Sequence, residues 1–331
     1  MIECIFTIDY EIYGNGEGSL RELVYEPTRR LKAIFDQAEA KFVVFVEAAE
    51  LEMIENFRAD PVIDEVKSQV KELYQQGHEI ALHLHPQWYN ARHESGKWLL
   101  DYSEYSLCLL PEVRIAEIVG RSITYLRTVL ADPEFTPSSF RAGNWLFQPT
   151  MPIAKVLSEH GIQIDSSVFK GGLQHQHGLD YRASSANGYF WNFKDDVNKP
   201  DRNGQILEIP IYTKKVPFWR MATGKRIGLQ RQISSSGKSV LQKLNRMLDR
   251  ARFWYPLKFD FCRMTLNELV DIVDNVLHED QQGPASVRPL VAIGHTKDLE
   301  DFKTVELFLS YLDKNGIAVT TLNEIYNKCE P

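Results

Sequence analysis

The chain has 331 residues, of which 44% are hydrophobic and 25% are charged, a composition typical of a folded globular protein and not of a disordered one. No apolar stretch approaches the roughly 20 residues that span a membrane, and the first residues lack the basic start and cleavage site of a secretory signal. The four cysteines are far apart and form no C-x-x-C pair, so we expect reduced thiols in a cytoplasmic protein.

Apolar, β-rich runs alternate with helical patterns along most of the chain. We expect strands near residues 2–9, 40–48, 78–86, 138–145, 161–168, 205–212, 289–296 and 317–321. We expect helices near residues 28–39, 60–76, 111–130, 152–161, 265–279 and 301–316, and a last helix at the C-terminus. This alternation predicts an α/β fold with a parallel sheet, and about seven such units predict a distorted or incomplete (β/α) barrel.

One region interrupts this alternation. Residues 213–263 contain thirteen Lys or Arg residues against Asp249 and Asp260, a net charge of +11, so that the rest of this −7 chain carries −18. We predict a basic helical insertion, helical over residues 239–255, within a single domain of residues 1–331. Two interpretations stay open: a surface that contacts phosphate, nucleotide or lipid headgroups at a membrane, or a solvated basic helix. The acidic balance of the whole chain argues against nucleic-acid binding.

Polar side chains recur at the carboxyl ends of the expected strands, where a (β/α) barrel carries its chemistry. They are Asp9, Glu11, Glu47, His83, His85, Arg141, Asp165, Glu208 and His295. Their shared position predicts an active site at one end of the barrel.

The stretch HEIALHLHPQW contains a possible pair of metal ligands. His83 and His85 are at i and i+2 of a strand, so both side chains point to the same face and can reach one metal ion. Asp9 and Glu11 have the same spacing after the first strand. Two histidines and one carboxylate form a ligand set that leaves positions open for water and substrate, and the second carboxylate can then act as a base. The alternative is a polar strand end without a metal.

Two further motifs fit catalysis. Arg141, in FRAGNW, lies just past a strand, where its charge can keep a neighbouring carboxylate ionised. The turn that follows can offer backbone N–H groups to an oxyanion. His295, in AIGHT, follows a late strand and can serve as a general acid, although a lone histidine is more often structural. We interpret His78, which follows a helix-ending glycine, as structural.

Taken in order, the motifs TIDYE, HEIALHLHP, FRAGNW, IDSSV and AIGHT resemble those of the polysaccharide deacetylases of carbohydrate esterase family four, over residues 7–296. The resemblance implies a barrel with a divalent metal, most often zinc, with cobalt, nickel or manganese as alternatives, and removal of an acetyl group from an amino sugar. It implies that His295 is the acid and Arg141 the partner of the base. The expected metal ligands are Glu11, His83 and His85, the expected base is Asp9, and the expected substrate or oxyanion contacts are Asn144, Trp145 and Asp165.

The sequence departs from the family pattern in three places. Asp9-Tyr10-Glu11 replaces two adjacent aspartates, so that either Asp9 or Glu11 can be the metal carboxylate. His83 and His85 replace two histidines that are four residues apart. The usual Pro-Tyr is missing after the arginine motif, which leaves the oxyanion contacts of residues 143–145 open.

The missing secretory signal favours an acetylated amino sugar linked to a nucleotide or a lipid, as a precursor of a surface polysaccharide, over extracellular chitin or peptidoglycan. One alternative is hydrolysis of a cyclic amide or imide at the same metal site. Another is a carbohydrate-binding barrel without catalysis. We expect His175 and His177, in a glycine-rich stretch, to lie in a surface loop, with a position lining the substrate cleft as the alternative. The sequence does not indicate the oligomeric state.

Overall fold

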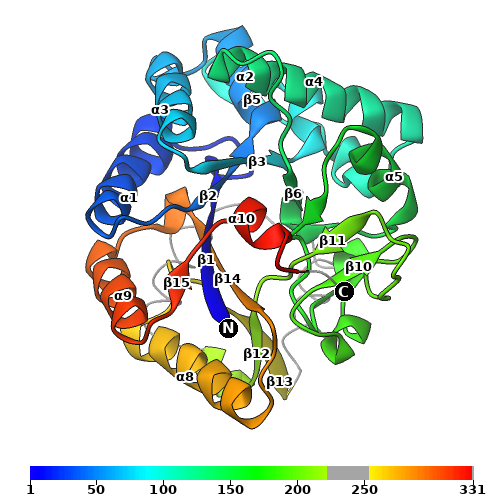
Figure 1. Ribbon diagram of the computed structural model, residues 1–331. Helices are drawn as coiled ribbons and strands as arrows, with labels where there is room; N and C mark the ends of the chain where they lie inside the picture. The colour runs from blue at the N-terminus through cyan, green and yellow to red at the C-terminus, as the bar shows by residue number, and fades with distance from the viewer. Residues whose placement is uncertain (222–252, 330–331) are drawn as a thin grey trace.

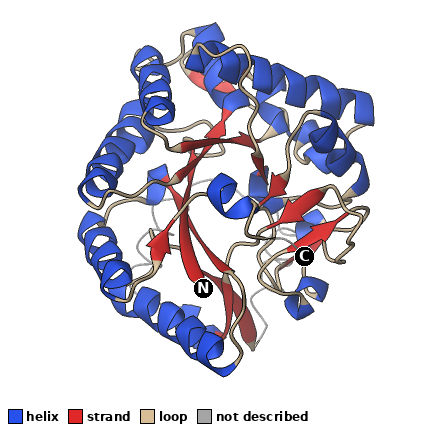
Figure 2. Ribbon diagram, in the orientation of Figure 1, coloured by secondary structure: helices blue, strands red, loops and turns tan. Residues whose placement is uncertain are grey.

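The computed structural model describes residues 1–221 and 253–329. Its main sheet has nine strands in the order β10-β11-β7-β6-β3-β2-β1-β14, with β15 also paired to β1 (Figure 1). Every pairing from β11 to β14 is parallel, and β10 joins β11 in antiparallel orientation. Helices surround the sheet on its outer side (Figure 2). The predicted α/β fold, a distorted (β/α) barrel, is therefore confirmed.

The strands of the main sheet are β1 (Ile2–Tyr10), β2 (Val43–Glu47), β3 (Glu79–Leu84), β6 (Ser139–Ala142), β7 (Ile164–Asp165), β10 (Trp191–Phe193), β11 (Ile206–Glu208), β14 (Arg288–His295) and β15 (Ala318–Val319). Three hairpins lie outside it: β4 (Arg92–Glu94) with β5 (Lys97–Leu99), β8 (Leu173–Gln174) with β9 (Leu179–Asp180), and β12 (Thr213–Pro217) with β13 (Trp254–Lys258). The α-helices are α1 (Glu26–Gln37), α2 (Ala48–Phe57), α3 (Ile63–Gln75), α4 (Glu112–Leu130), α5 (Met151–Glu159), α8 (Leu266–Gln282), α9 (Phe302–Lys314) and α10 (Leu322–Tyr326).

Burial on both faces explains the continuous apolar runs of the central strands. All residues of β1 and β2 are buried, as expected for parallel strands between a barrel interior and a layer of helices. Phe6 points outward from β1, with its ring 5.1 Å from that of Phe35 in α1 and 5.8 Å from that of Phe308 in α9. Because side chains alternate along a strand, Thr7 and Asp9 then point into the barrel.

The two ends of the barrel differ. At the amino-terminal ends of the strands, α10 lies across the opening in Figure 1, and the backbone N–H of Asn323 donates to Glu79 Oε2 at 2.8 Å. At the opposite ends, the chain carries the polar residues that follow β1, β2, β3, β6 and β14. This arrangement leaves the carboxyl ends of the strands for a site.

Several local expectations were wrong. Helix α2 was not predicted, because its residues continue the apolar run of β2 without a turn signal and its N-cap is Glu47, which is not a common cap residue. Trp254 and Tyr255, expected at the end of a basic helix, belong to β13, and Phe253 forms a bend before it; residues 239–252 of the expected helix lie outside the described residues. Among the described residues, no helix is long and apolar enough to cross a membrane. The cysteines are four buried free thiols.

Candidate active site

Arg141 and Asp9 form a buried ion pair inside the barrel. Arg141, in β6, donates from Nη1 to Asp9 Oδ1 at 2.6 Å and from Nη2 to Thr7 Oγ1 at 2.9 Å. Its Nε donates to the carbonyl of Ser166 at 2.9 Å, and its guanidinium carbon lies 4.0 Å from the centre of the Phe45 ring. These contacts fix the guanidinium, and through it the Asp9 carboxylate, in one orientation.

The surroundings of Asp9 keep its carboxylate ionised. Burial by itself raises the pKa of Asp9, but the charge of Arg141, followed by that of His83, outweighs burial and brings this pKa below its ordinary value. The second oxygen of Asp9 lies 3.3 Å from Nε2 of His295. Burial lowers the pKa of His295 to about 4, in spite of the charges of Asp9 and Asp298. The imidazole is therefore neutral at pH 7 and able to receive a proton.

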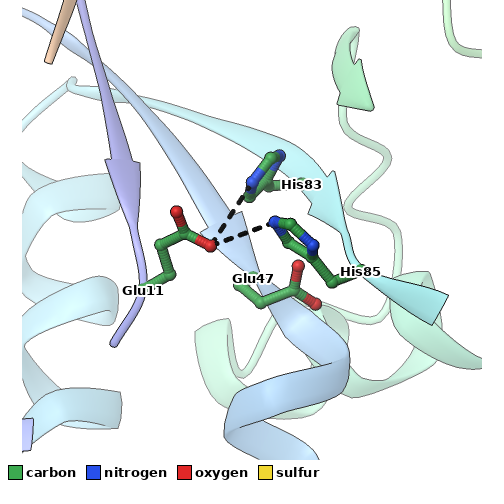
Figure 3. A group of neighbouring side chains, drawn as sticks. All are labelled: Glu11, Glu47, His83 and His85. Carbon is green, nitrogen blue, oxygen red and sulfur yellow. Dashed lines mark ion pairs between the residues drawn. The ribbon is translucent and has the colours of Figure 1, made fainter. Parts of the chain in front are cut away.

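Three further side chains converge inside the barrel, those of Glu11, His83 and His85 (Figure 3). Glu11 Oε2 lies 3.7 Å from Nε2 of His83 and 3.2 Å from Nε2 of His85, and all three side chains are buried. The other oxygen of Glu11 accepts from Lys297 Nζ at 2.8 Å. Burial alone raises the pKa of Glu11, but Lys297 and the two histidines hold it well below its ordinary value. One oxygen of Glu11 is thus bound to a lysine and the other faces two imidazoles.

The hydrogen bonds of the histidines decide which nitrogen is available to a metal. Nδ1 of His83 donates to the carbonyl of Arg141 at 2.8 Å, so Nε2 is the ring nitrogen that faces Glu11 and that a metal would take. Nδ1 of His85 lies 3.4 Å from the Gln87 amide and 3.3 Å from the Asn144 amide. Oε1 of Gln87 is buried without a partner among the described residues. A half-turn of the Gln87 amide brings this oxygen to Nδ1–H and likewise frees Nε2 of His85.

Glu47 is a fourth possible ligand beside Glu11, His83 and His85. The sequence placed Glu47 at a strand end but indicated no role for it. Glu11, Glu47, His83 and His85 each offer one ligand atom, and these atoms all lie within 4.8 Å of one another. Burial raises the pKa of Glu47 to about 7, although the neighbouring histidines oppose it. The i, i+2 spacing pointed to the other members, whereas Glu47 comes from a different strand and has no such signal.

The donor set fits a divalent cation. Burial lowers the pKa of His83, but the charges of Asp9 and Glu11 outweigh it and raise this pKa to about 9. The pocket therefore favours a positive charge where the imidazole nitrogens converge. Asp9, Glu11 and His295 form a second group within the same 4.8 Å limit. Of the two groups in the described part of the chain, the one that contains both His83 and His85 includes Glu11 and not Asp9, so Glu11 is the carboxylate better placed to hold a metal with both imidazoles.

The turn after β6 lines the same site. Asn144 and Trp145 have positive φ angles of 55° and 60°, an unfavourable conformation for non-glycine residues that is concentrated at functional sites. A Cβ atom on Gly143 would lie 2.6 Å from the carbonyl oxygen of Leu84 and 2.8 Å from the ring of His85. The close approach of this turn to His85 therefore requires glycine. The ring of Trp145 lies 6.2 Å from that of His295, in edge-to-face geometry.

Lys258 also reaches this region, and sequence reasoning counted it only as part of the basic window. Its Nζ lies 3.1 Å from the centre of the Trp145 ring and 4.7 Å from that of Phe169. Burial lowers the pKa of Lys258 to about 7, although Asp260 opposes this shift. Part of the surface of Lys258 remains exposed. No short motif marks this lysine in the sequence.

Asp165, expected at the substrate, contacts Ser167 and Glu208 in the structure. Its Oδ1 accepts from Ser167 Oγ at 2.7 Å, and its side chain pairs with that of Glu208 on the neighbouring strand. Burial raises the pKa of Asp165 to about 6 and that of Glu208 well above its ordinary value. Within the described part of the chain, neither possible metal group includes Asp165. These contacts hold the ends of β7 and β11 together.

Three further histidines singled out in the sequence, His78, His175 and His177, belong to neither possible metal group in the described part of the chain. His78 accepts from the backbone N–H of Phe42 at 3.3 Å, and its ring lies 4.3 Å from the Phe42 ring, as expected for a structural residue. His175 and His177 form a short 3-10 turn, and the ring of His177 lies 4.8 Å from that of Tyr105.

Comparison with known proteins identifies the fold. A scan against protein-family models finds no match, and a comparison with curated proteins finds none. Among solved structures, a protein from Mycobacterium smegmatis described as a polysaccharide deacetylase is 15% identical, with a TM-score of 0.51, covering 98% of this chain and 89% of that one. An allantoinase is 15% identical, with a TM-score of 0.50 and coverages of 99% and 89%.

A different enzyme class has the same fold. A GH57 branching enzyme from Thermococcus kodakaraensis is 12% identical, with a TM-score of 0.55, covering 99% of this chain and 71% of that one. A barrel shared by enzymes of such different chemistry does not by itself select a reaction. The chain therefore has the barrel fold seen in polysaccharide deacetylases, and its reaction has to be argued from its own site.

Proposed function

We propose that this chain is a metal-dependent hydrolase that removes an acetyl group from an amino sugar. The observation that carries the proposal is the convergence of two sets of side chains at one end of the barrel. Glu11, His83 and His85 bring three ligand atoms together, and Asp9, held by Arg141, lies beside them with His295. Metal ligands, an ionised carboxylate that can act as a base and an imidazole that can act as an acid are the groups that a metal-dependent hydrolysis of an amide uses.

Glu11, His83 and His85 are the proposed protein ligands of the metal. Two imidazole nitrogens and one carboxylate oxygen suit zinc, and also cobalt, nickel or manganese. A divalent cation held here supplies Lewis-acid activation of the acyl carbonyl and of water. Lys297 keeps Glu11 ionised and oriented through its bond to the oxygen that does not face the histidines.

Asp9 is the proposed general base. Its depressed pKa keeps it ionised, and Arg141 prevents it from turning away from the site. The proton that Asp9 takes from water can pass across 3.3 Å to Nε2 of the neutral His295. His295 then donates a proton to the departing amine, so that a single imidazole is neutral before the attack and acidic afterwards.

The turn of Gly143, Asn144 and Trp145 is the proposed wall of the acyl pocket. Asn144 and Trp145 have positive φ angles, which do not occur in regular helices or strands. We propose that this conformation makes backbone N–H groups of the turn available as donors to an oxyanion. The Trp145 ring, between His295 and Lys258, offers a flat surface against which a sugar ring can stack.

The proposed substrate is an acetylated amino sugar joined to a nucleotide or lipid carrier, in the cytoplasm. Support comes from the net charge of +11 over residues 213–263, which suits a diphosphate or an anionic membrane surface. Lys214, Lys215 and Lys258 are among the described residues of this window.

The test measures bound metal and acetate release together, over a panel of nucleotide-linked amino sugars, chitooligosaccharides and cyclic amides. We expect about one divalent ion per chain and acetate release, both lost in His83→Ala and His85→Ala. His278→Ala, which removes an exposed imidazole on α8, is the control and should retain both. Metal-free protein with full activity would overturn the mechanism, and turnover of a cyclic amide without acetate release would replace the proposed reaction.

A further inference from the structure

Glu47 is an unusual carboxylate within this barrel. It ends β2, is fully buried, and caps α2 through a hydrogen bond of 3.4 Å from the backbone N–H of Glu50. Its Oε2 is buried and has no hydrogen-bond partner among the described residues. Figure 3 shows its carboxylate beside the ring of His85.

The neighbouring acids show what Glu47 lacks. Asp9 has the guanidinium of Arg141 at 2.6 Å, and Glu11 has the ammonium of Lys297 at 2.8 Å. The described residues give Glu47 no ion pair with a lysine or arginine. A buried carboxylate oxygen without a partner is costly, and binding of an ion or ligand is one way to offset this cost.

A metal ion between the imidazoles is within reach of this oxygen. The ligand atoms of Glu47, Glu11, His83 and His85 lie within 4.8 Å of one another, so one ion can contact all four after small adjustments of the side chains. Because Lys297 already offsets the charge of Glu11, a second carboxylate would help to balance the charge of a divalent cation. The hydrogen bond from Glu50 restrains the side chain of Glu47 toward this position.

We propose that Glu47 is a fourth protein ligand, so that the site consists of two imidazoles and two carboxylates. This inference rests on the metal site of the proposed function and specifies its composition. Four protein ligands leave room for water and substrate only if the ion accepts five or six ligands. Such a site therefore suits manganese, cobalt, nickel or five-coordinate zinc better than tetrahedral zinc.

The experiment compares Glu47→Gln with Glu50→Gln in the full chain stripped of metal. Glu50 is a matched control because it is also fully buried, also has an unpaired Oε2, and lies three residues further along the chain, yet it belongs to neither metal group. Cobalt(II) is the probe, since its visible spectrum reports its ligands. Affinity is measured by calorimetry and thermal unfolding is followed with and without the metal.

We expect Glu47→Gln to weaken cobalt binding at least about 100-fold, more than is typical when a group outside the ligand set is lost. We also expect an altered cobalt spectrum and metal-free protein that unfolds at the same or a higher temperature, because an unpaired buried charge has been removed. Glu50→Gln should bind cobalt with wild-type spectrum and affinity within about threefold. If Glu47→Gln does not fold, Glu47→Asp shortens the side chain by one methylene and should show the same spectral change.

The outcomes separate the two proposals. A wild-type chain that binds no divalent metal removes the proposed function together with this inference. A wild-type chain that binds cobalt while Glu47→Gln binds it equally well, or with an unchanged spectrum, overturns the role of Glu47 alone. In that case the three-ligand site of Glu11, His83 and His85 stands.

Discussion

At the scale of single residues, the barrel interior is organised by charges that compensate one another. Arg141 has no exposed surface, and every polar contact described for it lies within the barrel. Breaking a buried ion pair on one side usually costs about 3–5 kcal/mol, because the remaining charge is left without a partner. Surface pairs such as Arg21 with Glu65, each about half exposed, contribute about 1 kcal/mol or less.

Arg141→Met should therefore lower the free energy of unfolding by about 3–5 kcal/mol at pH 7, and Arg21→Met by about 1 kcal/mol or less. In the wild type, the pKa of Asp9 is lower in the folded chain than in the unfolded chain. Ionised Asp9 therefore stabilises the fold at neutral pH, and this stabilisation is lost as the pH falls through the folded pKa. Without Arg141, burial raises the pKa of Asp9. The deficit of Arg141→Met should then shrink in acid, where Asp9 is protonated.

Urea unfolding at pH 7 and pH 4 measures this difference. The double variant Asp9→Asn with Arg141→Met should recover part of the stability, since no unpaired charge remains. A deficit for Arg141→Met that is equal at both pH values would show that packing of the guanidinium, and not its charge on Asp9, stabilises the barrel.

At the scale of elements, the turn after β6 connects the arginine motif to the histidine motif. Residues 141 and 83 are register partners in β6 and β3, and the turn continues from β6 across the end of β3. Gly143 lies where any side chain would collide with backbone and with the His85 ring. The position of His85 is therefore set by a neighbouring turn as well as by its own strand.

Gly143→Ala should displace His85 and weaken binding of a divalent metal by about 10-fold or more, as expected when the support of a ligand is disturbed. Gly283→Ala is the control, because a Cβ atom at residue 283 has no neighbour within 4 Å and the backbone there is extended. Calorimetric titration of both variants with zinc is the measurement. Equal affinities in Gly143→Ala and in the wild type would mean that His85 tolerates the shift.

At the scale of the whole molecule, the barrel is closed by irregular backbone. Beyond β11, Ile211 bridges to Phe169 and to Val291, and the backbone N–H of Tyr212 donates to the carbonyl of Val291 at 3.0 Å. This segment joins one edge of the sheet to β14 without forming a long strand. It brings the β11 edge of the sheet to β14, where His295 is in register with Asp9 of β1.

Ile211→Ala should lower the free energy of unfolding by about 2–5 kcal/mol, because it leaves a cavity at a fully buried position of the closure. Val113→Ala, at an exposed position of α4, should change stability by about 0.5 kcal/mol or less. Chemical denaturation gives both values. A loss for Ile211→Ala no larger than that of Val113→Ala would show that the closure collapses around the smaller side chain at no cost.

The sequence by itself determined the repeating architecture and most of the polar groups at one end of it. Apolar runs of β1, β2, β3 and β14 predicted buried parallel strands, because local hydrophobic patterns report burial on both faces. The i, i+2 spacing predicted that His83 and His85 share a face, and strand order predicted that Asp9, Arg141 and His295 meet. These features depend on local periodicity and chain order alone.

Only the tertiary structure decided which groups share contacts across strands. It brought Glu47 to the two histidines, placed Lys297 on Glu11, and turned Asp165 toward Glu208. Pairing between strands that are far apart in sequence sets these distances, and no local pattern encodes it. Helix α2 was missed for a similar reason, since its start at Glu47 is determined by where β2 ends in the sheet and not by a turn residue.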